Sequence, residues 1–85
     1  VTAAADRPIV IYGASWCGAC RSAAAFLRQK GVAFVEKDIE RDAAANAEMQ
    51  SKLRAAGLEA HGIPVIDVRG QMMTGFDPAR IEALL

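Results

Sequence analysis

The sequence predicts a single α/β domain in which a mixed four-stranded sheet is flanked by three helices. Two observations lead to this fold class: short apolar runs alternate with segments of helical periodicity, and the last two runs are separated by a two-residue turn. The expected order is strand, helix, strand, helix, strand, strand, helix. A right-handed crossover makes the first two strands parallel, and the final hairpin adds an antiparallel pair.

The first half of the chain predicts two strands around one helix. Residues 9–12 are a continuous apolar run, which is typical of a central strand covered on both faces. Residues 18–30 carry apolar side chains at helical spacing, and Gly31 supplies a C-terminal stop. The second strand is expected over residues 32–39.

A second helix is predicted to follow Asp42 and to end at Gly57. Its charged side chains are most simply a solvated face. The inward stripe is expected to contain Ala45, Met49, Leu53 and Ala56.

A hairpin and a last helix complete the predicted fold. Residues 65–68 and 72–74 are its two strands, with Met72 and Met73 expected to alternate between core and surface. Asp77 then caps the last helix. The buried stripe of this helix is expected to contain Ile81, Leu84 and Leu85.

The two cysteines of the chain, Cys17 and Cys20, follow the first apolar run with two residues between them. We expect a helix to begin at or beside Cys17, which places its sulfur against unpaired backbone N–H groups. Those donors and the helix dipole favour the thiolate, the form that attacks a disulfide. Cys20, one turn further, is expected within reach but more shielded. The pair predicts a redox-active dithiol in which Cys17 attacks a disulfide and Cys20 resolves the mixed disulfide.

Other interpretations of the pair stay open. A structural disulfide across so short a loop would remove little chain entropy. A zinc ion or an iron-sulfur cluster needs about four ligands. The chain adds only His61, which is more simply a polar residue at a loop edge than a base for Cys17. A redox-inert binding domain is opposed by both cysteines.

Three segments, taken with the order of elements, resemble the thioredoxin superfamily. The short length of the chain resembles that of the glutaredoxins. Residues 16–20 (WCGAC) are similar to the thioredoxin motif with alanine in its third position, and residues 62–64 (GIP) match the segment of the cis-proline. Residues 74–77 (TGFD) are similar to the glycine-aspartate segment of glutaredoxins. The resemblance covers almost the whole chain. It implies a thioredoxin-like fold and a small thiol-disulfide oxidoreductase that reduces protein or glutathione-mixed disulfides.

The resemblance also implies a substrate-binding surface around the dithiol. A cis Ile63–Pro64 bond would leave the Ile63 backbone groups free to pair with an extended substrate. Trp16 is expected to form one wall of this surface, because tryptophan is enriched among interface anchors. From the residues alone, Trp16 also fits a half-buried aromatic side chain, and Pro64 fits a residue that merely precedes a strand.

A glutathione site is implied at Gly75, Phe76 and Asp77, where the turn and helix start of glutaredoxins hold the ends of that tripeptide. A helix cap alone explains Asp77 equally well. Ala14 stands where glutaredoxins usually carry a lysine, and Pro78 replaces their second aspartate. We therefore expect weaker glutathione binding than in a glutaredoxin with the full charged pocket.

No metal or organic cofactor is expected for the basic reaction, with glutathione as an optional co-substrate. The implied partners are disulfide-containing proteins, together with glutathione or a thioredoxin-reductase-type electron donor. A second hypothesis is an iron-sulfur or metal-carrying module in which Cys17 ligates a cluster shared between two chains and glutathione. Ala19, in place of a rigid proline, makes this alternative easier to accommodate.

The length of 85 residues allows one small domain, expected over residues 7–85 after a flexible lead-in over residues 1–6. Ten Lys and Arg balance ten Asp and Glu, which predicts no nucleic-acid or membrane surface. No uncharged stretch is long enough to span a membrane. We expect a soluble monomer. The cysteine usage favours a cytoplasmic protein, but the chain begins at Val1 without methionine, so an exported or excised domain stays open.

Overall fold

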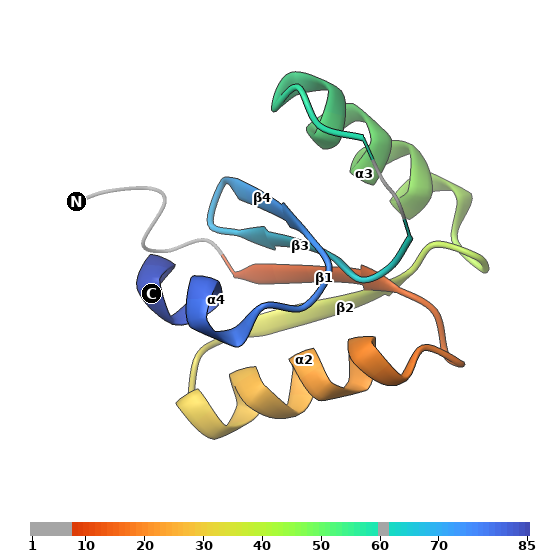
Figure 1. Cartoon of the computed structure of the whole chain (residues 1–85). Helices are drawn as coiled ribbons and strands as arrows, with labels where there is room; N and C mark the ends of the chain where they lie inside the picture. Colours follow the sequence, from red (N-terminus) through yellow and green to blue (C-terminus); the bar gives the residue numbers. More distant parts are fainter. Residues whose placement is uncertain (1–7, 60–61) are drawn as a thin grey trace.

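A computed structural model describes residues 8–59 and 62–85 and contains one mixed sheet with helices on both faces (Figure 1). The elements confirm the predicted order. The strands are β1 (Ile9–Gly13), β2 (Phe34–Asp38), β3 (Val65–Val68) and β4 (Gln71–Thr74). The helices are α2 (Gly18–Lys30), α3 (Ala43–Ala55) and α4 (Pro78–Leu84).

The strand β1 lies inside the sheet, whose order is β2-β1-β3-β4. It pairs in parallel with β2 and antiparallel with β3, while β3 and β4 form the antiparallel hairpin. All residues of β1 are buried, which confirms the prediction of a central strand covered on both faces. The chain leaves β1 and enters β3 at the same end of the sheet (Figure 1).

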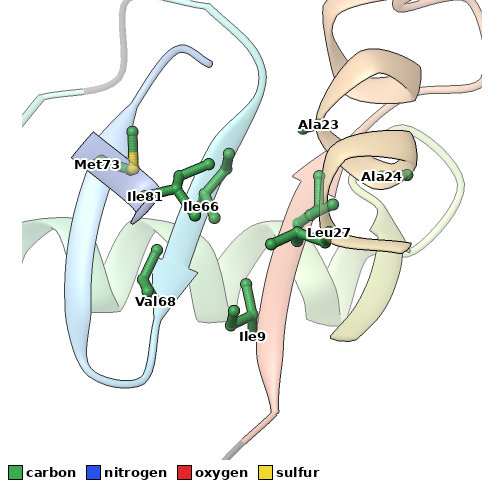
Figure 2. Packing of buried hydrophobic residues seen from close by; sticks show 9 residues of the cluster. Ile9, Ala23, Ala24, Leu27, Ile66, Val68, Met73 and Ile81 are labelled. Carbon is green, nitrogen blue, oxygen red and sulfur yellow. The ribbon is translucent and has the colours of Figure 1, made fainter. Parts of the chain in front are cut away.

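The hydrophobic core has one part on each face of the sheet. The larger part lies under α2 and α4, and Figure 2 shows Ile66 and Ile81 together beside β3 while Leu27 of α2 lies over β1. The smaller part lies under α3, where Met49 and Leu53 pack on Val10 and other residues of the sheet. A sheet covered on both faces explains why β1 reads as an unbroken apolar run.

The second strand is shorter than the predicted span of residues 32–39. β2 pairs with β1 from Phe34 to Asp38, and the register ends where β1 ends. Val32 instead follows the C-cap of α2, and its N–H donates to the Leu27 carbonyl at 3.4 Å. A helix end and a strand start of similar apolar character are not separable by periodicity.

Three predicted burial assignments were wrong. Ala56 is exposed because it is the C-cap residue, past the last turn of α3. Leu85 is 39% exposed because it follows the end of α4. Leu84, the last residue of that helix, is half-buried. Met72 and Met73 are both buried, on opposite faces of β4, because helices cover both sides of the sheet.

Some predictions fall outside the described residues. These are the flexible lead-in over residues 1–6, the start of the domain at residue 7, and the loop-edge position of His61. Within residues 8–59 and 62–85, no helix has both the length and the apolar character needed to cross a membrane.

Candidate active site

Cys17 is the N-cap residue of α2, as the sequence predicts. Its backbone is extended, with φ −82° and ψ 111°, and its sulfur accepts the N–H of Cys20 at 3.1 Å. The Cys17 N–H donates in turn to the Ala14 carbonyl at 3.1 Å, so a tight turn leads into the helix. Helix-start donors of this kind stabilise a thiolate relative to a thiol.

Cys17 and Cys20 are joined by a disulfide, with their Cα atoms 5.2 Å apart. Both residues are 5% exposed in this oxidised state. The expectation that Cys20 is the more shielded of the two does not hold in the disulfide form, where both residues are equally buried. The two cysteines differ in their position at the start of α2, and not in their exposure.

Gly13, the last residue of β1, supplies the space that Cys20 occupies. A Cβ atom on Gly13 would lie 2.5 Å from the Cys20 sulfur and 3.1 Å from the Cys20 Cβ. Any side chain there would displace Cys20, since real Cβ atoms essentially never approach so closely. This role of Gly13 was not predicted from the sequence. The only signal was a glycine that ended an apolar strand four residues before Cys17.

A pocket of about 220 Å³ opens beside Cys20, between the start of α2 and the ends of β1 and β2. Ala14 and Gly13 line it from one side, and Glu36 and Asp38 line it from β2. Ala14 is only 9% exposed, so a longer side chain at this position has to extend through the pocket.

The Ile63–Pro64 bond is cis, as predicted. The register places Val65 opposite Tyr12, so Pro64 lies at the end of the sheet from which the dithiol loop leaves. Pro64 is buried and Ile63 is half-buried. Among the described residues, neither the N–H nor the carbonyl of Ile63 forms a hydrogen bond.

The segment Gly75, Phe76 and Asp77 lies next to Pro64. The Gly75 N–H donates to the Pro64 carbonyl at 2.7 Å. Phe76 is half-buried and packs edge-on against Phe26 of α2, with the ring centroids 5.8 Å apart. Asp77 caps α4, and its carboxylate accepts the Arg80 N–H at 3.3 Å.

Trp16 is the most exposed large hydrophobic side chain of the described residues, at 66%. Its indole N–H donates to the Glu40 carboxylate at 2.8 Å. The contact with Glu40 was not predicted from the sequence, because 24 residues separate Glu40 from Trp16 and no local pattern connects them.

A second polar cluster joins α3 to the sheet, away from the disulfide. Tyr12 donates to Glu48 and accepts from Lys52, which also contacts Asp67 at 2.7 Å. Burial and the neighbouring Glu48 raise the pKa of Tyr12 to about 12. Burial lowers the pKa of Lys52, but its hydrogen bonds to Asp67 and Tyr12 outweigh that effect, so its pKa lies above the ordinary value.

A metal site was the main alternative for the cysteines. Within the parts of the chain that the structure describes, no group of three or more His, Cys, Asp or Glu side chains is arranged to hold a metal ion.

The chain is similar to known glutaredoxin-like and thioredoxin-like proteins. A family model described as glutaredoxin matches residues 9–73. A glutaredoxin-like 8.6 kDa protein from the rubredoxin operon of Clostridium pasteurianum is 30% identical over 77 residues, covering 91% of this chain and 96% of that protein.

Two of the solved structures with a similar fold are a thioredoxin-like and a glutaredoxin-like protein. The thioredoxin-like protein BC3987 has a TM-score of 0.76 and 27% identity, covering 91% of this chain and 99% of its own. The glutaredoxin-like NrdH-redoxin from Escherichia coli, described as having a thioredoxin-like activity profile, has a TM-score of 0.69 and 25% identity, covering 93% of this chain and 96% of its own.

The thioredoxin-like fold and the CxxC disulfide at the start of α2 define a thiol-disulfide oxidoreductase of the thioredoxin superfamily. Within that superfamily, the chain belongs to the glutaredoxin family. Both conclusions confirm what the resemblance of its motifs implied.

Proposed function

We propose that this oxidoreductase reduces disulfides of partner proteins, with Cys17 as the nucleophile and Cys20 as the resolving thiol. One observation carries the assignment: the Cys17 sulfur caps α2 and accepts a helix-start N–H at 3.1 Å. An attacking sulfur needs thiolate character, and this position favours it. Cys20 lies inside the first turn against Gly13 and is bonded to Cys17 in the disulfide.

The reaction takes two exchange steps. The Cys17 thiolate attacks one sulfur of the substrate disulfide, which breaks, and the departing substrate thiolate takes up a proton. The Cys20 thiol then loses its proton and attacks the Cys17 sulfur of the mixed disulfide. The second substrate thiol leaves, and the Cys17–Cys20 disulfide forms. The substrate gains two electrons, and an external dithiol or two thiols must return them to the protein.

We infer that an extended substrate segment docks beside the dithiol against Ile63, Pro64 and Trp16. The Ile63 backbone groups have no hydrogen-bond partner among the described residues, so they are available to an added strand. The exposed indole of Trp16 offers an apolar contact next to Cys17.

In this proposal the protein acts as a monomer, and light scattering is the measurement that checks its oligomeric state.

For the electron donor, we propose a thioredoxin-reductase-type enzyme ahead of glutathione. The relative from Escherichia coli has a thioredoxin-like activity profile, and this chain has Ala14 where a glutathione site benefits from a cation. Gly75, Phe76 and Asp77 remain the proposed contacts for glutathione as a weak co-substrate. No metal or organic cofactor takes part in this scheme.

A turnover assay tests the proposal. Reduction of insulin or another protein disulfide is followed with thioredoxin reductase and NADPH, and separately with glutathione, glutathione reductase and NADPH. We expect higher turnover with thioredoxin reductase, and none in the Cys17→Ser variant. Absence of turnover with both systems, and with dithiothreitol as a chemical donor, would contradict the proposed function.

A further inference from the structure

The most exposed large hydrophobic side chain in the described part of the molecule directly precedes the dithiol. Trp16 is 66% exposed, and the next most exposed large hydrophobic residue of the described part, Val35, is 41% exposed. An indole this exposed would ordinarily sample several orientations. Here its N–H donates to the Glu40 carboxylate at 2.8 Å, which restricts the orientation of the ring next to Cys17.

Glu40 is itself held in place by the turn between β2 and α3. Its backbone N–H donates to the Asp38 carboxylate at 2.9 Å. The preceding residue, Ile39, donates its N–H to the Gly13 carbonyl at 2.9 Å. This turn is therefore tied to the end of β1, from which the dithiol loop leaves. The backbone at Glu40 is therefore held beside the end of β1.

The Glu40 charge has no cationic partner in the described part of the chain. None of the ion pairs there includes it. The nearest cation in sequence, Arg41, contacts Asp38 at 3.9 Å. Arg21, on the other side of the loop, donates to the Ser15 carbonyl at 2.7 Å. An indole N–H satisfies one oxygen of Glu40 but leaves its negative charge uncompensated.

We propose that Trp16 and Glu40 form a docking surface that selects substrate disulfides flanked by a basic residue. A Lys or Arg side chain lays its apolar stem on the indole while its charged head faces Glu40. The face of the indole ring also attracts the charged head through a cation–π interaction. The Glu40 carboxylate repels substrates that carry an acidic residue beside the disulfide. It also disfavours glutathione, which carries two carboxylates. The inference rests on the proposed function of Cys17 and Cys20 and names the substrate class of that site.

Two variants separate the charge of Glu40 from its hydrogen bond. Glu40→Gln keeps an oxygen that accepts the indole N–H but removes the charge, whereas Glu40→Ala removes both. Trp16 is the single tryptophan of the chain, so intrinsic fluorescence reports its environment directly. We expect acrylamide quenching and anisotropy to be unchanged in Glu40→Gln and to indicate a more mobile indole in Glu40→Ala.

The substrate preference is measured in a single turnover that needs no added reductant. Two peptides differ only in a Lys or a Glu next to one cysteine, which carries a nitrothiobenzoate mixed disulfide. The reduced protein releases nitrothiobenzoate from each peptide, and its second-order rate constants are compared at low ionic strength. The Cys17 thiolate itself attracts cations, so the diagnostic quantity is how far a substitution changes the Lys-to-Glu ratio.

We expect the parent protein to prefer the Lys peptide and Glu40→Gln to reduce the Lys-to-Glu ratio by about two- to fivefold. Added salt should reduce the ratio of the parent more than that of the variant. Glu82→Gln is the matched control, because it removes the same charge beside Lys30, at the opposite end of α2. Its ratio should equal that of the parent. Arg21→Gln removes a positive charge and should not lower the ratio.

Two results separate failure of this inference from failure of the proposed function. A ratio that is the same in the parent, Glu40→Gln and Glu82→Gln, with both peptides reduced, overturns the inference and leaves the function standing. Failure to release nitrothiobenzoate from either peptide overturns both.

Discussion

The Gly75 N–H donates to the Pro64 carbonyl at 2.7 Å, and this bond joins the segment before β3 to the segment after β4. Gly75 has a φ of 83°, a left-handed conformation in which a side chain would be strained. The register of β3 and β4 puts Thr74 opposite Val65, so the hairpin itself brings Gly75 to Pro64. The fold therefore sets the relative position of two segments proposed to contact substrate.

Gly13→Ala tests the close packing behind Cys20. The added Cβ would lie 2.5 Å from the Cys20 sulfur, so either β1 or the start of α2 has to move. We expect a loss of about 1 to 3 kcal/mol in the free energy of unfolding, measured by urea denaturation. Gly18→Ala is the control, because nothing lies within 4 Å of a Cβ at that position. Equal stability of the two variants would contradict the packing argument.

Asp77 variants separate helix capping from glutathione binding. Asp77→Ala removes the acceptor for the Arg80 N–H and should lower stability by about 0.5 to 2 kcal/mol. Asp77→Ser keeps a capping oxygen without the charge, so thermal unfolding should remain close to that of the parent. If Asp77 also contacts the amine of glutathione, Asp77→Ser should raise the KM for a glutathione-mixed disulfide. An unchanged KM would leave capping as its whole role.

Ala14→Lys tests why glutathione is expected to bind weakly. The new side chain starts at a residue that is 9% exposed and has to run through the pocket beside Cys20. We expect its ammonium group to raise turnover of glutathione-mixed disulfides by about two- to tenfold, with a stronger dependence on salt. Ala14→Met has a similar length without the charge. An equal gain in both variants would show that charge is not the missing element.

The pKa of Tyr12 is predicted to lie far above that of an ordinary tyrosine. Its pKa is about 12 in the folded protein against 10.0 for the free side chain, because burial and Glu48 disfavour the phenolate. The neutral hydroxyl therefore stabilises the fold fully below pH 10, and this contribution is lost as the pH rises toward 12.

The chain has a single tyrosine, so the absorbance of tyrosinate measures this titration directly. A midpoint near 10 in a protein still folded by circular dichroism would contradict the prediction. Tyr12→Phe should remove the part of the alkaline loss of stability that comes from this hydroxyl.

The local features of this chain could be predicted from its sequence because each rests on neighbours in sequence. The helix start at Cys17, the cap at Asp77 and the apolar run of β1 are of this kind. The contact of Glu40 with Trp16 could not be predicted, because it depends on how the turn after β2 docks on β1. The burial of both Met72 and Met73 was not predicted, because Met72 packs in the part of the core under α3, an element distant in sequence.

Trapping experiments test the order of the two exchange steps. Cys20→Ser retains the attacking sulfur but lacks the resolving thiol, so it should accumulate a mixed disulfide with substrate that is visible by mass spectrometry. Cys17→Ser should accumulate none, because the first step requires the thiolate at the helix start. A stable adduct on Cys17→Ser alone would reverse the assignment.

The relative acidity of the two thiols in the reduced protein tests the central claim most directly. Rapid alkylation with iodoacetamide over a range of pH, read by mass spectrometry of the separate peptides, gives the pKa of each thiol. Cys17 should be labelled first at mildly acidic pH, with a pKa below the value of about 8.5 of a free cysteine, because it alone caps α2. Preferential labelling of Cys20 under those conditions would contradict the account.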